Sequence, residues 1–350
     1  MFYNLGMTDI TLALPFALPP PELAKDLIRA LQTPALAMLL TRHSHFQYSV
    51  FDNNSRVLPH EAWLAHTLGL ASAPQQADTG APLATACMRG CGLAAQASEG
   101  HWFLLQPSHV QISRTHMLLS DLRALQLGEA DSRALYDVAR PYFEEVGKTL
   151  LHGAPGLWFM RADDWAGLNT ASPDATTTQS MTDWLPEGAQ ARDFRRLQNE
   201  VQMLWHEHPV NQARQASGLQ PVNSCWLWGG ASPAAPSGQL SIAGGEPWMQ
   251  ALAKPVQPSA AQLIAQPGTV MLAELVAAAQ AGDWAEWLMR MQRLEQEWFT
   301  PLLAALKDGR IGSIRLMLSH RQGWTSVTSN KLAQRAFWRK PTLNPLLKQS

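Results

Sequence analysis

Apolar and polar positions in the first hundred residues follow first the period of a strand and then the period of helices. Residues 8–14 have strand propensity and end at a proline. Residues 19–32 then predict a helix with proline in its first turn and one apolar face. Because further helical segments follow, we expect residues 1–97 to form an N-terminal part made of a strand and helices.

The pattern changes near residue 100, where strand-like and helix-like segments begin to alternate. Alternation of this kind is typical of a layered fold with a sheet and covering helices. We therefore expect residues 98–230 to form a compact subdomain, with strands within 101–113, a helix over 128–147, a hairpin over 149–162 and a helix over 191–207. The polar segment 169–183 is expected to be a loop.

Residues 231–350 form the third part, which we expect to pack on the core. Its first thirty residues are rich in Pro, Gly, Ala and Ser and predict a flexible connection. A long helix should follow from an Asp283 cap to Gly309, with a buried stripe at Trp287, Met291, Leu294 and Trp298. A hairpin within 312–329 should end the fold. The whole pattern predicts an α/β fold with a mixed sheet flanked by helices.

Composition narrows the classes of function. With 46% hydrophobic residues and a formal net charge of −1, the 350-residue chain has no overall field that would attract nucleic acid. No apolar run reaches the roughly 20 residues that a membrane span needs, and we identify no signal peptide. Three cysteines are too few for a disulfide framework. We therefore expect a cytoplasmic protein with no nucleic-acid partner and no membrane partner.

The densest group of polar residues and glycines lies between residues 208 and 230. Proline after His208 favours a helix break there, and Asn211 and Arg214 then share a face of the next short helix. Arginine can bind phosphate or carboxylate with two hydrogen bonds, and glycines let backbone N–H groups approach an anion. The sequence thus predicts a ligand-binding site at His208, Asn211, Arg214, Asn223, Gly229 and Gly230.

A structural interpretation of the same residues is equally open. Asn211 and Asn223 can tie loops to the backbone, and His208 can cap a helix. Arg214 can pair with Glu200 or Glu207. We do not expect a metal at His206 and His208, because alternate residues of a helix point apart and no third ligand lies nearby.

This stretch resembles a motif of the archaeal-type, cofactor-independent phosphoglycerate mutases of the alkaline-phosphatase superfamily. The resemblance implies a degenerate alkaline-phosphatase-like core with an α+β subdomain. Over its whole length the chain resembles more closely the RpfE-type regulatory proteins of bacteria, in segments such as "LALPFALPPPE", "HWFLLQPSHVQISRTHMLL" and "FWRKP". The matching residues of the mutase motif are His208, Pro209, Asn211, Arg214, Gly218, Asn223, Trp226, Trp228, Gly229 and Gly230.

This chain departs from the mutase pattern at positions that the two-metal reaction requires. The resemblance implies an Asp-Gly after the first strand, a Ser or Thr nucleophile and later Asp and His ligands for two metal ions. Here the first strand runs into Pro15 and Phe16, the Asp-Gly at Asp308 lies at a helix end, and Asp-His occurs nowhere. A two-metal site needs several carboxylate and imidazole ligands. We therefore expect no catalytic residue, no metal and no cofactor.

Three hypotheses of function follow. The first is a non-catalytic regulatory protein that binds a small phosphorylated or carboxylate metabolite, or a protein partner. The second is a divergent metal-dependent phosphoglycerate mutase or phosphatase, which would require distant residues to converge on metal. The third is an oligomeric scaffold that uses apolar residues of 284–306, Trp298 among them. The residues of the second hypothesis are Asp9, Asp121, His109, His116 and His320.

Overall fold

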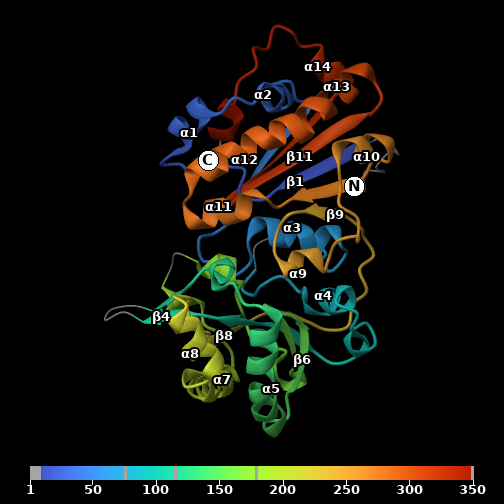
Figure 1. Ribbon diagram of the computed structural model, residues 1–350. Coiled ribbons are helices and arrows are strands. Elements are labelled where there is room, and N and C mark those ends of the chain that lie inside the picture. Colours follow the sequence, from blue (N-terminus) through green and yellow to red (C-terminus); the bar gives the residue numbers. More distant parts are fainter. Residues whose placement is uncertain (1–8, 75–76, 113–116, 178–179, 348–350) are drawn as a thin grey trace. The chain divides into compact units, whose positions relative to one another are not determined.

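The computed structural model describes residues 9–74, 77–112, 117–177 and 180–347. The chain forms two compact units, each built from segments distant in the sequence (Figure 1). Unit 1 comprises Met1–Asn53, Gln239–Gly245 and Ala253–Ser350, and unit 2 comprises Asn54–Gly238 and Glu246–Leu252. The expected parts 1–97, 98–230 and 231–350 do not coincide with these units, because unit 1 contains segments from both ends of the chain.

Unit 1 is organised around a six-stranded mixed sheet, so the predicted mixed α/β fold is confirmed. The central strand β1 is parallel to β10 and β11, whereas β12 is antiparallel to both of its neighbours. The predicted C-terminal hairpin is the β11–β12 pair. Across the sheet the order is β2 (His45–Val50), β12 (Gly323–Asn330), β11 (Ser313–His320), β1 (Asp9–Leu14), β10 (Thr269–Leu272) and β9 (Ser241–Ala243).

Helices pack on one face of this sheet through the apolar side chains that alternate along its strands. Ile10, Leu12 and Leu14 of β1 are buried in one cluster with residues of the helices. Trp287 and Phe299 are fully buried in the same cluster. The helices are α1 (Ala24–Ala30), α2 (Pro34–Thr41), α10 (Ala260–Ala265), α11 (Leu275–Ala281), α12 (Trp284–Leu294), α13 (Thr300–Asp308), α14 (Lys331–Gln334) and the short η6 (Asn344–Leu347).

The predicted long helix is confirmed, together with both of its ends. The Asp283 carboxylate accepts the N–H of Glu286 at 3.0 Å, and Gly309 ends α13 with a φ of 81°. A π-helical turn, η5 (Glu295–Phe299), joins α12 to α13 just before Pro301. Trp298 is only 3% exposed, so this residue of the scaffold hypothesis lies in the core, whereas Met289 of α12 is 58% exposed.

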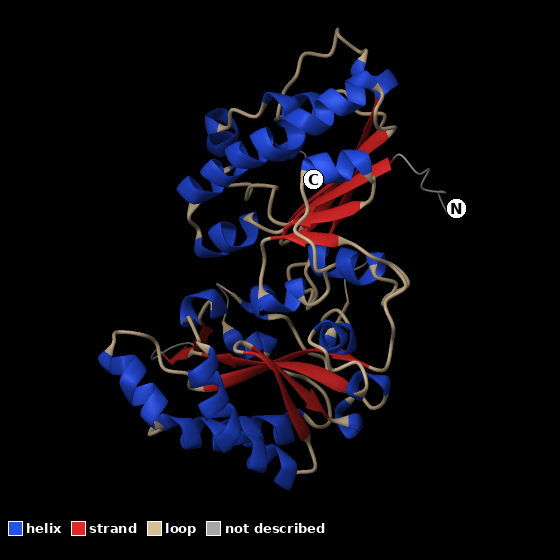
Figure 2. Cartoon of the chain, turned by 45° about the vertical axis from the view of Figure 1, so that its right-hand side comes forward, coloured by secondary structure: helices blue, strands red, loops and turns tan. Residues whose placement is uncertain are grey.

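Unit 2 contains a four-stranded antiparallel sheet with helices on both faces (Figure 2). Leu135 and Phe143 of one helix and Phe194 and Val201 of another are buried against the sheet, as their helical spacing predicted. The sheet order is β6 (Thr149–Ala154), β7 (Leu157–Arg161), β3 (Trp102–Ser108) and β8 (Ser224–Ala231), and β4 (Val110–Ile112) pairs separately with β5 (Met117–Leu119). The larger helices are α3 (Pro59–Thr67), α4 (Ala84–Gly90), α5 (Glu129–Glu145), α6 (Pro173–Thr176), α7 (Ala191–His206), α8 (Pro209–Ala216) and α9 (Pro247–Gln250), and the short 3₁₀ turns are η1 (Gln96–Ser98), η2 (Leu122–Leu125), η3 (Asp163–Trp165) and η4 (Met181–Trp184).

Two segments expected to be loops are more ordered than their composition predicted. The polar segment 169–183 contains α6, and three of its hydroxyl-bearing side chains bond locally. Ser172 caps α6 by accepting the N–H of Ala175 at 3.2 Å, and the hydroxyls of Thr176 and Thr177 donate to carbonyls four residues earlier. The segment 231–260 is not simply a flexible connection, since it contains β9 and α9. A strand of three residues gives too short a pattern to be recognised in sequence.

In the part of the chain that the structure describes, no helix combines the length and the apolar character that a bilayer span requires.

Candidate functional site

The residues between 208 and 230 connect α7, α8 and β8 within unit 2. His208 is the N-cap of α8, and its Nδ1 accepts the N–H of Val210 at 3.2 Å. Gly218 follows α8 with a φ of 75°, a conformation that favours glycine. The predicted helix break before Pro209 and the helix end near Gly218 are therefore both confirmed.

Asn211 and Arg214 lie together on the buried face of α8. Asn211 Nδ2 donates to the carbonyls of Trp205 and Val222, each at 2.8 Å, and its Oδ1 accepts the N–H of Val222 at 2.8 Å. This amide therefore joins the end of α7 to the start of β8. Its side chain is only 1% exposed.

Arg214 bonds three separate segments. Its Nε donates to the carbonyl of Gln220 at 2.9 Å, and one Nη donates to the carbonyl of Leu125 in η2. The other Nη lies 3.5 Å from Asp131 of α5, so Arg214 pairs with a carboxylate, but with Asp131 in place of Glu200 or Glu207. Arg214 thus holds η2 in place, and its guanidinium is bonded on all three nitrogens.

Asn223 and the two glycines contact residues of neighbouring strands. Asn223 pairs with the backbone of Val110, accepting its N–H at 2.7 Å and donating to its carbonyl at 2.9 Å. Gly229 has a φ of 67°, and a Cβ there would lie 2.8 Å from Leu104. A Cβ on Gly230 would lie 2.6 Å from the ring of Phe103. All six residues thus have contacts that fit the structural interpretation, while anion binding by them stays a prediction.

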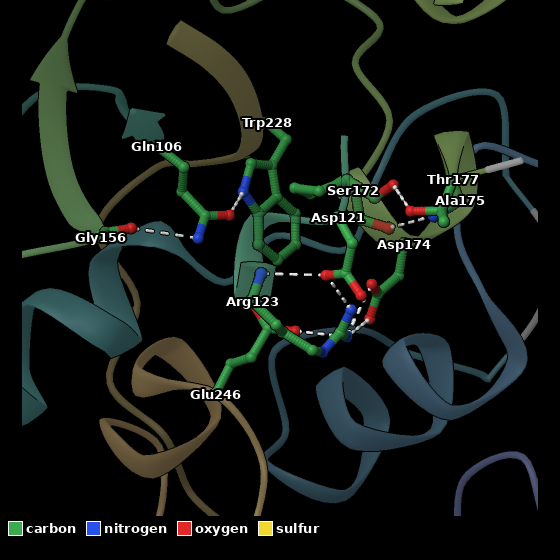
Figure 3. A network of polar contacts seen from close by, with 11 residues as sticks. Gln106, Asp121, Arg123, Gly156, Ser172, Asp174, Ala175, Thr177, Trp228 and Glu246 are labelled. Atoms are coloured by element: carbon green, nitrogen blue, oxygen red, sulfur yellow. Dashed lines mark hydrogen bonds and ion pairs between the residues drawn. The ribbon is translucent and has the colours of Figure 1, made fainter. Parts of the chain in front are cut away.

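A cluster of charged side chains that are 7–23% exposed, which we name the Arg123 cluster, lies in the same unit and comprises Asp121, Arg123, Asp174 and Glu246 (Figure 3). Arg123 projects from η2, the turn held by Arg214. Its guanidinium lies 2.8 Å from Asp121, 2.7 Å from both carboxylate oxygens of Asp174 and 2.5 Å from Glu246. One cation therefore joins η2 to α6 and to the start of α9.

The pKa values of two groups in or near the Arg123 cluster differ from their ordinary values. Burial and the Asp174 carboxylate raise the pKa of Glu246 to about 8, although Arg123 acts in the opposite direction. Burial, with a smaller contribution from Arg123, lowers the pKa of nearby His60 to about 3. At neutral pH we therefore expect a protonated Glu246 and a neutral His60.

Replacing Glu246 with glutamine is expected to change how stability depends on pH. Because the pKa of Glu246 is higher in the folded state than in the unfolded chain, its stabilising effect is full below about pH 4.5 and is lost as pH rises toward 8. Glutamine should remove this decline, which for one group is at most about 1.4 kcal/mol per pH unit. Urea unfolding between pH 4.5 and 8 measures the slope.

The control for this substitution is Glu144→Gln, at a glutamate whose side chain is 55% exposed on α5. The control should keep the wild-type slope. Equal slopes in the wild type and Glu246→Gln would contradict the assignment.

Sequence reasoning did not find the Arg123 cluster. Asp121 was named only as a possible metal ligand, and its true partner, Arg123, stands two residues away. Asp174 and Glu246 come from distant segments, and Asp174 lies in the stretch expected to be a loop. The local Asp-x-Arg spacing was the one available signal, and it is common on protein surfaces.

The residues of the enzyme hypothesis do not gather at one place in either unit. Asp9 accepts a hydrogen bond from Ser313 at 2.7 Å where β1 and β11 begin. His320 lies at the other end of β11, about 23 Å away at 3.3 Å per residue. In unit 2, His109 contacts the carbonyl of Pro221 at 2.8 Å and Asp121 binds Arg123. His116 lies outside the described residues.

The carboxyl edge of the parallel strands in unit 1 also differs from the mutase pattern. Phe16 stands just after β1 with a φ of 58°, in the region that favours glycine. Its carbonyl accepts the indole N–H of Trp287 at 2.9 Å. His320 lies 3.4 Å from the hydroxyl of Tyr48, and burial lowers its pKa to about 4. Within the described ranges, no three His, Cys, Asp or Glu side chains could together hold a metal ion, so these residues do not fit a two-metal site.

A serine and a histidine in unit 2 lie within hydrogen-bond distance, as in some nucleophilic sites. Ser132 Oγ is 3.0 Å from His152 Nε2, but its hydroxyl donates to the carbonyl of Pro155 at 2.7 Å and it accepts the indole N–H of Trp158 at 3.1 Å. Ser132 is also fully buried. Since its proton is committed to a carbonyl, His152 does not serve it as a base. Burial raises the pKa of Cys225 to about 12, which leaves that thiol unreactive.

Comparison with known proteins places the chain near a group of archaeal enzymes. It is 27% identical over 216 residues to a 2,3-bisphosphoglycerate-independent phosphoglycerate mutase of Methanosarcina barkeri, an overlap of 60% of this chain and 51% of the mutase. It is 40% identical over 57 residues to the enzyme of the same name from Methanothrix thermoacetophila, 16% of this chain and 14% of that enzyme. The chain thus matches about half the length of the first mutase and less of the second.

The fold has a solved counterpart. The PH0037 protein from Pyrococcus horikoshii superposes on the chain with a TM-score of 0.55 and 12% sequence identity, over 98% of this chain and 92% of that one. No family model matches the sequence. The sequence matches support homology between this chain and the cofactor-independent phosphoglycerate mutases.

Proposed function

From this homology we propose that the chain is a cytoplasmic regulatory protein of the RpfE type, derived from a cofactor-independent phosphoglycerate mutase, that acts by binding and does not transfer phosphoryl groups. One observation supports the proposal: among the described residues of each unit, the Asp and His side chains that a two-metal site would need do not gather at one place. Asp9 bonds to Ser313 at one end of the sheet and His320 lies at the other. A phosphoryl transfer that depends on two metal ions has no ligand set there.

The decisive experiment is a metal and activity measurement on the full chain. We expect protein purified in the presence of Mn²⁺ to contain well under one divalent ion per chain by elemental analysis. We also expect no interconversion of 3-phosphoglycerate and 2-phosphoglycerate. The Methanosarcina barkeri mutase, assayed alongside, is the positive control. Two bound ions per chain together with interconversion would overturn the proposal.

The ligand class of the proposal is a small phosphorylated or carboxylate metabolite. Two points support it: the similar proteins are phosphoglycerate mutases, whose substrate carries both a phosphate and a carboxylate group, and the site predicted at 208–230 contains an arginine. Asn211 and Arg214 are buried and bonded to the chain, whereas His208 is partly exposed at the start of α8. His208 is therefore the residue of the three that a ligand can reach most easily.

A thermal-shift measurement with 3-phosphoglycerate and phosphoenolpyruvate tests this binding. A ligand that prefers the folded state raises Tm in proportion to the logarithm of its concentration. We expect such a rise in the wild type, its loss in His208→Ala and its retention in His206→Ala, a matched control at an exposed histidine. No rise with either compound, or equal rises in all three proteins, would remove the site from 208–230.

A further inference from the structure

The last part of unit 1 has an uneven distribution of charge that the net value of −1 conceals. Residues 309–350 contain eight of the chain's 27 lysines and arginines and none of its 28 aspartates and glutamates. Asp308, just before this segment, pairs with Arg310 at 3.3 Å. A strongly basic region therefore ends a chain whose remaining residues are acidic on balance.

Two large aromatic side chains are exposed within this basic region. Phe337 is 79% exposed and Trp338 is 71% exposed, and their rings stack edge to face with centroids 5.3 Å apart. Leu332 on α14 is 72% exposed. We define the basic–aromatic patch as Leu332, Arg335, Phe337, Trp338, Arg339 and Lys340. Exposed apolar side chains grouped in this way mark interaction surfaces.

The segment that carries the patch is fixed on both sides, so the exposure does not come from a loose tail. Before the aromatic pair, Gln334 Nε2 donates to Ser329 Oγ at 2.7 Å and to the carbonyl of Arg42 at 3.2 Å. After it, Thr342 and Thr41 exchange two hydrogen bonds of 2.9 Å. The fold therefore holds Phe337 and Trp338 in an anchored, outward-facing turn.

We propose that the basic–aromatic patch docks unit 1 on an anionic phospholipid surface. Lysine and arginine side chains attract acidic headgroups, and tryptophan and phenylalanine partition into the interfacial layer of a bilayer. This docking is peripheral and requires no spanning helix. The earlier expectation of no membrane partner rested on the absence of an apolar span, which does not describe a local surface patch.

Charge and composition favour this partner over two others. A second copy of the chain, docked patch to patch, would bring Arg335, Arg339 and Lys340 against the same cations, which repel. Single-stranded nucleic acid stacks its bases on aromatic rings, but the exposed aliphatic chain of Leu332 has no role in that contact. In a lipid interface, Leu332 is buried together with the aromatic pair.

Vesicle co-sedimentation of the full chain tests the proposal. We expect binding to vesicles that contain phosphatidylglycerol, little binding to pure phosphatidylcholine and loss of binding at high salt. Arg335→Gln together with Lys340→Gln should weaken partitioning about 25-fold, or about fivefold for each charge. Trp338→Ala should weaken it about tenfold or more. Brominated phospholipid should quench the fluorescence of the wild type more than that of Trp338→Phe.

The matched controls lie on exposed parts of the same unit. Met289→Ala removes an apolar side chain that is 58% exposed on α12, and Arg29→Gln removes a charge whose side chain is 80% exposed on α1. Both controls should bind vesicles like the wild type, and all variants should keep the wild-type Tm. Failure to bind phosphatidylglycerol vesicles, or equal weakening by the controls, would overturn the proposal. Tighter binding to a single-stranded oligodeoxynucleotide through the same residues would also overturn it.

Discussion

Replacing Arg123 with methionine is expected to lower the free energy of unfolding by about 3–5 kcal/mol at neutral pH. The substitution leaves Asp121, Asp174 and Glu246 close together without the cation that joins them. Removing one partner of a buried ion pair is more costly than the pair's own net contribution, because the remaining charges stay desolvated. Urea unfolding at pH 7 measures the loss.

The same variant should recover part of its stability at acid pH. Arg123 lowers the pKa of Glu246, so without Arg123 this carboxyl group binds its proton still more tightly in the folded state than in the unfolded chain. The resulting stabilisation appears as pH falls and disappears as pH rises. Arg133→Met is the control, because the Arg133 side chain is 52% exposed and pairs with Glu129 on the same helix. A control loss above about 1 kcal/mol, or an Arg123→Met loss without pH dependence, would contradict the interpretation.

Replacing Arg214 with methionine is expected to cost a similar amount, about 3–5 kcal/mol. The carbonyls of Leu125 and Gln220 would lose their donor inside the protein, and Asp131 would lose its cation. A residue whose main role is to receive a ligand behaves differently, because its replacement leaves the unliganded fold nearly unchanged. Chemical unfolding without any added anion therefore separates a structural role for Arg214 from a role limited to binding.

The control for this substitution is Arg196→Met, at a side chain that is 82% exposed on α7. It should change the free energy of unfolding by less than about 0.5 kcal/mol. If Arg214→Met were as mild as the control, the arginine would be available to an anion and the ligand-binding interpretation would gain support.

Periodic segments were predictable from sequence because their neighbours determine them locally. The helix from Asp283 to Gly309 and the hairpin of β11 and β12 have a clear period and clear ends. The edge strands were not predicted: β9 has three residues, and β2 leaves Val50 69% exposed, so no buried face marks it. Edge strands of a sheet give weak patterns because one side lacks a neighbour.

Predicting the site was harder for a different reason. The polar residues at 208–214 were conspicuous because they are adjacent, but their contacts hold segments together, as Asn211 does for α7 and β8. The Arg123 cluster was invisible because it joins residues from three distant segments. Charge alone does not tell which of the chain's carboxylates an arginine will contact, since that depends on the completed fold.

The division of the chain into interleaved units affects how it can evolve and how it can be dissected. The backbone passes between the units at four places, after residues 53, 238, 245 and 252. A polypeptide of residues 54–238 would lack Glu246, and also Trp248, whose ring stacks on Trp228 at 5.1 Å. Unit 2 is therefore not a cassette that can be excised or transplanted by one pair of cuts. Gain or loss of sequence is more easily accommodated within loops of either unit than by removal of a whole unit.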